Sequence, residues 1–412
     1  MDKESVLFIQ LQSPSGEWID VGLLRNRDEK NWFEFIDSYW DRADRPVLGQ
    51  IFEEQGRRWE PNTHVALPRW FSHLLPEGRL RDAVARAADV NSSREFELIL
   101  RLGATDLPGA VRAVTPAGKI PTSATPAPSD DSDEAERDPL LKFSLAGAQL
   151  KFSIYGDERG LTIPATGQAG NFILKFPDGR AGFDGVPEAE LASLELARAI
   201  GIDTPKAKLV DPADVTGLEK WAAATKGMAL AVERFDRRAG DTRVHMEELA
   251  QVLNIPTARE RAKYKGANFE TVAIFVGALA GVDHVGDVID RIVLNVLVGN
   301  GDAHLKNWAF LYPDGKHPAL SPVYDILPTV LYIPNDGLGL NLRRSKQFAA
   351  VTAKGFEVLG ARSGYGSELA KKRAKSAVEK VLDQWPTLEQ FLKKESFQRL
   401  SDRLKSLQLV NR

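Results

Sequence analysis

The stretch GNGDAHLKNWAFLYPDGKHPALSPVYD, residues 299–325, decides the fold prediction. Apolar residues recur at helical spacing over 288–297, so we expect a helix that ends where the stretch begins. The Gly-Asn-Gly run at 299–301 then tolerates the tight, irregular backbone of a loop. Two strand-like runs, WAFLY and PALSPVY, flank the turn PDGK and predict a hairpin that delivers Asp325.

Three side chains in this stretch carry oxygen atoms suited to phosphoryl transfer. Asp302 and Asn307 stand five positions apart, which is the D-x-x-x-x-N interval of a protein-kinase catalytic loop, and the hairpin returns Asp325. That chemistry needs a carboxylate that accepts the proton of the attacking hydroxyl, with an amide and a second carboxylate that hold Mg²⁺. We therefore predict Asp302 as the catalytic base and Asn307 and Asp325 as metal ligands. The alternative, in which Asp302 and Asn307 only cap turns and Asp325 ends a strand, stays open at this point.

A cation for the triphosphate is predicted at Lys175. It lies in the strand-like run NFILKFP between Leu174 and Phe176, where a lysine is costly to bury unless it is paired. Glu190 offers the pair, because it shares the apolar stripe of a predicted helix over 187–200. We expect an ion pair between Lys175 and Glu190, as in the small lobe of a kinase. A solvent-facing lysine in a strand is the ordinary alternative.

Two further segments bear on nucleotide binding. The turn SLAGAQ, residues 144–149, is either an ordinary hairpin or a place where backbone N–H groups approach phosphates. Ser144 in it either bonds its own backbone or lies near enough to a γ-phosphate to be modified. The run AVERFDRR, 231–238, is either an inter-lobe hinge, with Phe235 near an adenine, or a charged edge strand. His304 either orients its loop, touches phosphate, or makes only structural hydrogen bonds.

Composition and pattern divide the chain into four parts. Residues 1–117 mix short strand-like and helix-like runs and predict a small α+β domain. Residues 118–140 concentrate Pro, Ser, Thr, Asp and Glu and predict an acidic linker. Residues 141–240 are strand-rich, whereas 241–412 are mainly helical. We therefore expect an α+β, bilobal protein-kinase-like fold, with a strand-rich small lobe and a helical large lobe, preceded by the amino-terminal domain.

Composition also restricts the function classes. Lys and Arg total 54 against 57 Asp and Glu, a formal charge of −3, which argues against a basic surface that coats nucleic acid. The absence of cysteine excludes disulfides, thiolate metal sites and a cysteine nucleophile, and the six histidines form no HExxH motif. No run approaches the ~18 apolar residues of a membrane span, and the first residues lack a secretory pattern. We expect a soluble cytoplasmic protein.

The motifs, in their order and spacing, resemble the HipA family, the kinase toxins of HipBA toxin–antitoxin modules. The resemblance covers about 140–350 closely and rests on FSLAGAQLKFS, FILKFP, AELASLELARAIGI, AVERFDRR, HMEELAQ, GNGDAHLKNWAF, LSPVYDILP and LGLNLRRSKQF. In addition, WFSHLLPEG at 70–78 and DLPGAVRA at 106–113 resemble the amino-terminal domain of full-length members.

The resemblance implies a bilobal Ser/Thr protein kinase that uses ATP and Mg²⁺. It implies the same catalytic base, Asp302, and the same metal ligands, Asn307 and Asp325, as the spacing does. Ser144 matches the serine that family members autophosphorylate, a modification that ejects the loop and silences the kinase. The implied ATP-binding residues are Ala146, Gly147, Ala148, Gln149, Lys175, Glu233, Phe235 and His304, with Glu190 holding Lys175.

The resemblance also implies a substrate and partners. Family members phosphorylate an aminoacyl-tRNA synthetase, typically the glutamyl enzyme, and so arrest growth. A HipB-like helix-turn-helix antitoxin neutralises them and brings them to operator DNA indirectly. Two other functions stay open: an antitoxin-bound co-repressor whose kinase activity is weak or silent, and a kinase that acts on a lipid or small molecule.

Overall fold

The computed structural model describes most of the chain. The described residues are 4–104, 106–116, 151–158, 160–164, 168–177, 179–223, 225–257 and 260–411. The linker expected at 118–140 lies outside them. So does the predicted phosphate turn, with Ser144, Ala146, Gly147, Ala148 and Gln149.

The amino-terminal domain is built on an antiparallel sheet with the strand order β4-β3-β2-β1-β5. Apolar residues alternate along β1, so that Leu7, Ile9 and Leu11 are buried on one face of the sheet. An aromatic cluster around Phe33 and Trp70 fills the space between this sheet and the short helices. The strands are β1 (Ser5–Gln12), β2 (Trp18–Arg27), β3 (Lys30–Phe35), β4 (Asn62–His64) and β5 (Val111–Val114), and the helices are α1 (Asp37–Trp40), α2 (Gln50–Gln55), α3 (Arg69–Ser72), α4 (Gly78–Ala87) and α5 (Glu95–Leu102).

A second sheet forms the strand-rich lobe, with the order β10-β7-β6-β8-β11-β9. The helix predicted over 187–200 is confirmed as α6, which carries a proline in its first turn and is followed by Gly201 at a φ of 87°. Leu191 and Leu194 on α6 are buried where the helix covers the lobe. The elements are β6 (Lys151–Asp157), β7 (Gly160–Thr162), β8 (Phe172–Lys175), α6 (Val186–Ala199), β9 (Ala207–Val210), β10 (Val215–Thr216), α7 (Glu219–Ala223) and β11 (Ala229–Glu233).

The helical lobe is built around a buried α10 (Val285–Val298), with other long helices packed against it. The predicted helix end is confirmed, because α10 stops at Gly299 in the left-handed conformation. The predicted hairpin is also confirmed as β13 (Ala309–Tyr312) paired with β14 (Ala319–Leu320), and β12 (His245–Glu248) adds a third strand. The remaining α-helices are α8 (Leu249–Val252), α9 (Phe269–Leu279), α11 (Ala353–Ser363), α12 (Ser367–Asp383) and α13 (Lys394–Leu404).

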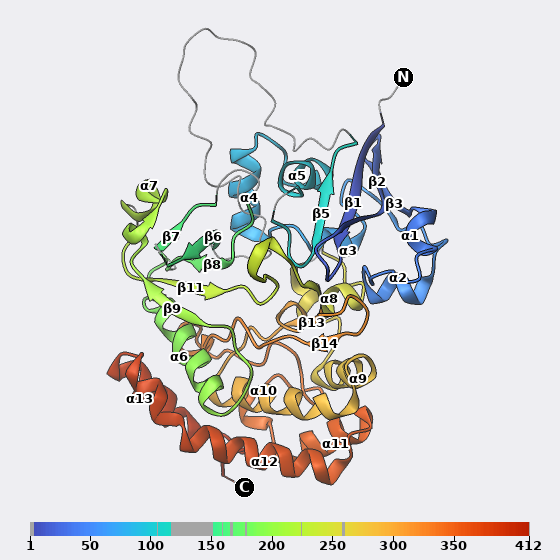
Figure 1. Cartoon of the computed structure of the whole chain (residues 1–412). Coiled ribbons are helices and arrows are strands. Elements are labelled where there is room, and N and C mark those ends of the chain that lie inside the picture. The colour runs from blue at the N-terminus through green and yellow to red at the C-terminus, as the bar shows by residue number, and fades with distance from the viewer. Residues whose placement is uncertain are drawn as a thin grey trace.

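Figure 1 shows the three parts in contact: the amino-terminal domain in blue and cyan lies beside the green strand-rich lobe, above the orange and red helical lobe. No helix in the described ranges is long and apolar enough to cross a membrane.

A buried charge cluster joins the amino-terminal domain to the segment after β11. Asp106 accepts from Arg234 at 2.7 Å and from Arg237 at 2.8 Å, and Asp236 accepts from Arg234 at 2.8 Å. The Gly109 N–H donates to Asp236 at 2.8 Å. The edge-strand alternative for AVERFDRR is wrong, since β11 lies between β8 and β9, and the charges that follow β11 are buried because the DLPG loop neutralises them.

Candidate active site

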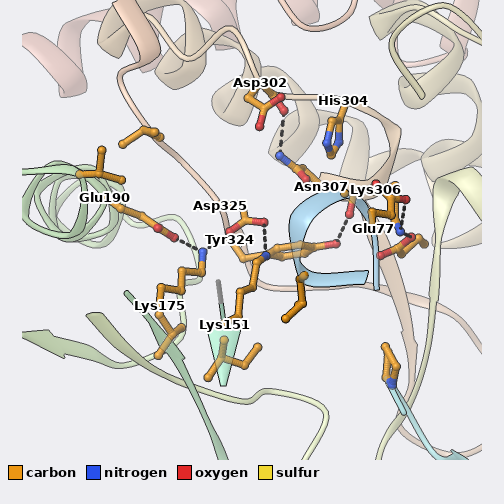
Figure 2. A pocket seen from close by; sticks show the side chains of 18 of the residues that line it. Glu77, Lys151, Lys175, Glu190, Asp302, His304, Lys306, Asn307, Tyr324 and Asp325 are labelled. Atoms are coloured by element: carbon orange, nitrogen blue, oxygen red, sulfur yellow. Dashed lines mark hydrogen bonds and ion pairs between the residues drawn. The ribbon is translucent and has the colours of Figure 1, made fainter. Parts of the chain in front are cut away.

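One cavity of about 840 Å³ opens where the two lobes and the amino-terminal domain meet. Every predicted site residue within the described ranges lines it. These are Lys175, Glu190, Glu233, Phe235, Asp302, His304, Asn307 and Asp325. Residues separated by up to 150 positions in the sequence therefore share one site, and Figure 2 shows several of them from close by.

Lys175 is held between two carboxylates. The ion pair expected with Glu190 of α6 is present, with Lys175 Nζ 2.5 Å from Glu190 Oε1, and Lys175 also donates to Asp325. Burial alone would lower the pKa of Lys175, but Asp325 and Glu190 outweigh it and raise that pKa. Burial raises the pKa of Glu190, opposed by Lys175. The ammonium is thus fixed in its charged form beside the hairpin-delivered aspartate.

A second lysine, Lys151, lies opposite Lys175 in the sheet. The two residues are register partners across β6 and β8. Like charges directly opposite each other destabilise a strand pair, so an anion is needed between them. Asp325 supplies it, because its Oδ2 lies 3.5 Å from Lys151 Nζ while Oδ1 accepts from Lys175. Sequence reasoning missed Lys151, since nothing in LKFS reveals its register.

Residues 302–307 form a loop that follows the end of α10 and is closed by a hydrogen bond between its first and last residues. The Asn307 side-chain Nδ2 donates to the Asp302 carbonyl at 2.9 Å, and the Asp302 N–H donates to Asn300 Oδ1 at 3.0 Å. The Asp302 carboxylate is exposed and accepts from the Tyr264 hydroxyl. Asn307 therefore holds the turn with its nitrogen and leaves its amide oxygen available as a ligand, so its turn-capping and metal-binding roles are compatible.

Asp325 follows the hairpin in a left-handed conformation, with a φ of 55°. Aspartate is one of the few non-glycine residues that adopt this conformation at low cost. Burial would raise the pKa of Asp325, but Lys151 and Lys175 outweigh it and hold that pKa well below its usual range. The carboxylate is ionised at neutral pH, as a metal ligand must be.

The oxygen donors present suit Mg²⁺ better than a transition metal. In the described part of the chain no three His, Asp or Glu side chains gather as a metal cluster. Asn307 and Asp325 could hold a cation there through their side-chain oxygens, with substrate phosphates or water completing the shell. Mg²⁺ is commonly bound in this way in phosphotransferases.

His304 and the segment after β11 line the rest of the cavity. Burial lowers the pKa of His304 to about 4, so its imidazole is neutral at pH 7. Its Nδ1 has no hydrogen-bond partner among the described residues, and its ring lies 5.0 Å from the Tyr264 ring. Glu233 ends β11, and the Phe235 ring lies 5.4 Å from the Tyr324 ring.

Besides Lys151, the cavity residues that were not predicted include Glu77, Lys263, Tyr264 and Lys306. Glu77 belongs to the WFSHLLPEG motif, and Lys306 stands between the predicted base and the predicted Asn307 ligand, but neither had a partner visible in the sequence. Their pairing depends on how the amino-terminal domain docks, which no local pattern encodes.

Family models match both parts of the chain. The HipA N-terminal domain matches residues 17–114, and the HipA-like C-terminal domain matches residues 143–387. Among curated proteins, Y4dM of Sinorhizobium fredii, designated a candidate kinase, is 38% identical over 395 residues, which is 93% of this chain and 92% of the relative. The Shewanella oneidensis serine/threonine-protein kinase toxin HipA is 25% identical over 289 residues, which is 63% of this chain and 62% of the relative.

The fold is shared with a solved structure. The Shewanella oneidensis HipA chain, solved with HipB and its operator DNA, matches at a TM-score of 0.72 and 18% identity, over 98% of this chain and 96% of that chain. This likeness confirms the expected α+β fold, in which an amino-terminal domain precedes a kinase-like body. With both domain models matched and a 38% identical relative along nearly its whole length, the chain belongs to the HipA family.

Proposed function

We propose that the chain is an ATP- and Mg²⁺-dependent protein Ser/Thr kinase that acts as a growth-arresting toxin. The observation that carries the proposal is the convergence of Lys175, paired to Glu190, with Asp302, Asn307 and Asp325 on one cavity. Protein kinases need this combination of a paired phosphate-binding lysine, a base, and two oxygen ligands for the metal. Mg²⁺, when bound, would neutralise the charge that develops on the phosphates.

The side chains then divide the work. Asp302 accepts the proton of the acceptor hydroxyl, because its carboxylate is exposed to the cavity and already accepts from a hydroxyl, that of Tyr264. Asn307 and Asp325 hold the metal, and Lys175 and Lys151 bind phosphate oxygens. The implied adenine contacts are Glu233 and Phe235. The neutral His304 and the turn Ala146, Gly147, Ala148 and Gln149 are assigned to the phosphates.

The names of the relatives support the wider proposal. One relative is named a serine/threonine-protein kinase toxin, and a solved homologue is a complex with HipB and operator DNA. We therefore propose a HipB-like antitoxin as partner, with operator DNA reached through it. As substrate we propose an aminoacyl-tRNA synthetase, the glutamyl enzyme first, and as a self-silencing site Ser144.

The test is phosphotransfer by the purified chain. With radiolabelled ATP and Mg²⁺ we expect labelling of the chain at Ser144, loss of labelling with EDTA, and loss in Asp302→Ala. Induced expression should arrest growth for the wild type and not for Asp302→Ala. Labelling that persists in Asp302→Ala would refute the assigned base.

Two other results would redirect the function. Nucleotide binding without any transfer would favour the antitoxin-bound co-repressor. Phosphoproteomes of cells expressing the wild type or Asp302→Ala would identify a protein substrate, and identical phosphoproteomes despite ATP turnover would favour a lipid or small-molecule acceptor.

A further inference from the structure

Glu77 brings the amino-terminal domain into the cavity. It precedes α4, and its carboxylate clasps two lysines of the helical lobe: Oε1 lies 2.8 Å from Lys306 Nζ and Oε2 lies 2.8 Å from Lys263 Nζ. Figure 2 shows Glu77 and Lys306 side by side at one end of the cavity, away from Lys175. Glu77 therefore lies at the end of the cavity that holds Lys263 and Lys306, and not at the end that holds Lys175 and is proposed to bind phosphate.

Lys306 connects this contact to both proposed metal ligands. It stands next to Asn307 in the chain, and its carbonyl accepts from the Tyr324 hydroxyl at 2.7 Å, one residue before Asp325. Its ammonium is buried and lies 3.4 Å from Glu248 besides Glu77. The position of the ammonium thus fixes the backbone from which Asn307 projects.

Lys263 connects the contact to the proposed base. It precedes Tyr264 in the 3₁₀ segment Glu260–Tyr264, and the Tyr264 hydroxyl donates to Asp302. The Tyr264 ring also packs edge-on against His304. One carboxylate of the amino-terminal domain therefore holds the catalytic loop through Lys306 and, through Lys263, the segment whose Tyr264 contacts Asp302.

The two ion pairs of Glu77 are strengthened by the charges of their lysines. Burial alone would raise the pKa of Glu77, but Lys306 and Lys263 outweigh it and hold that pKa well below its usual range. The carboxylate stays ionised at neutral pH, and charge-assisted hydrogen bonds of this kind restrict geometry more than neutral ones do.

We propose that Glu77 is a positioning residue for phosphotransfer, so that the amino-terminal domain completes the catalytic loop rather than only covering it. The inference rests on the proposed kinase function. It requires that loss of the carboxylate loosens the loop of Asp302 and Asn307 while leaving the nucleotide end of the cavity, around Lys175 and Glu190, intact.

The experiment compares full-length Glu77→Gln with the wild type and with Glu97→Gln. The second variant is the control, because it removes the carboxylate of an exposed ion pair with Arg94 on the same domain. Transfer rates are normalised to nucleotide-binding sites titrated with ADP, so that unfolded protein does not count. For Glu77→Gln we expect kcat to fall about 10- to 100-fold, since small misplacements of catalytic groups cost that much. We expect KM for ATP to stay within about twofold, because the interaction acts on the transition state.

A second readout does not depend on activity. Amide hydrogen exchange of the peptide 299–312 should speed up in Glu77→Gln and not in Glu97→Gln. Lys263→Gln, which leaves Glu77 with Lys306, should show both effects more weakly and serves if Glu77→Gln does not fold. Unchanged exchange and unchanged kcat per site in a folded variant would overturn the inference. An inactive wild type would overturn the proposed function, whereas the exchange measurement would still decide whether Glu77 orders the loop of Asp302 and Asn307.

Discussion

Removing the amine of Lys175 is the sharpest test of the site's electrostatics. Lys175→Met keeps the approximate volume and apolar stem but leaves the buried carboxylate of Glu190 beside the partly exposed carboxylate of Asp325. Breaking a buried pair by deleting one partner costs about 3–5 kcal/mol. Lys151 still lies 3.5 Å from Asp325 and compensates one carboxylate, so we expect the lower end of that range.

The expected loss is measurable as a fall in melting temperature. About 3 kcal/mol corresponds to a fall of about 3–4 °C if the 412-residue chain unfolds as one unit, because the entropy of unfolding grows with chain length. The loss of stability should be smaller at about pH 5.5 than at about pH 8. Burial raises the pKa of the unpaired Glu190 carboxyl in the folded variant, so at the lower pH it binds a proton and no longer places an unpaired charge inside the lobe, whereas this stabilising protonation is lost as pH rises. Lys208→Met, an exposed lysine on β9 of the same sheet, is the control and should change the melting temperature little.

A double variant separates this reasoning from simple loss of packing. Lys175→Met/Glu190→Leu removes the unpaired carboxylate as well, so it should melt above Lys175→Met even though it carries one more substitution. The reasoning fails if the double variant loses as much stability as Lys175→Met and Glu190→Leu lose separately. It also fails if Lys175→Met melts at the temperature of the wild type, because the charges of Lys175, Glu190 and Asp325 would then not stabilise the lobe.

Three further changes test other parts of the structure. Asp325→Asn should raise the Mg²⁺ concentration for half-maximal phosphotransfer at least about tenfold, because it removes the charged ligand and the partner of two lysines. Arg234→Gln should lower the free energy of unfolding by about 3 kcal/mol, and with it the melting temperature, since it leaves Asp236 and Asp106 with too few positive partners in a buried cluster. Burial, opposed by Lys306, raises the pKa of Glu248 from 4.5 to about 7, so the folded chain holds a proton that the unfolded chain releases, and stability falls as pH rises across that interval. In Glu248→Gln about 3 kcal/mol of this pH dependence should disappear from unfolding curves measured between about pH 5 and about pH 8.

The two stability changes, Arg234→Gln and Glu248→Gln, each have a matched control on the surface. Arg238→Gln and Glu54→Gln replace exposed residues and should leave the melting temperature and its pH profile unchanged. An unaltered Mg²⁺ requirement in Asp325→Asn would remove Asp325 from the metal site. Equal melting of Arg234→Gln and Arg238→Gln, or a pH profile in Glu248→Gln that matches the wild type, would contradict the burial argument for that residue.

The elements that the sequence predicted are those encoded by local periodicity and turn chemistry. The helix before Gly299, the β13–β14 hairpin and the helix after Pro187 are local features, and the structure contains them. The partner of Lys175 was predictable because a lysine in an apolar strand and a glutamate on an apolar stripe each need a counter-charge.

The rest of the site depends on long-range docking. Lys151 reads as an ordinary strand lysine until its register opposite Lys175 is known. Glu77 and Lys306 are 229 positions apart, and no periodicity relates them. The contact between Lys175 and Asp325 likewise depends on where the hairpin lies relative to the small-lobe sheet.

The charge cluster around Arg234 also limits how the polypeptide can be cut. In the whole molecule Arg234 and Arg237 face Asp236 and Asp106, two positive against two negative side chains. If residues 1–117 and 141–412 were expressed separately, the first fragment would carry Asp106 and the second Arg234, Asp236 and Arg237, which leaves an excess positive charge on the second fragment. We expect the two fragments to bind each other when mixed, because each carries the counter-charge that the other lacks.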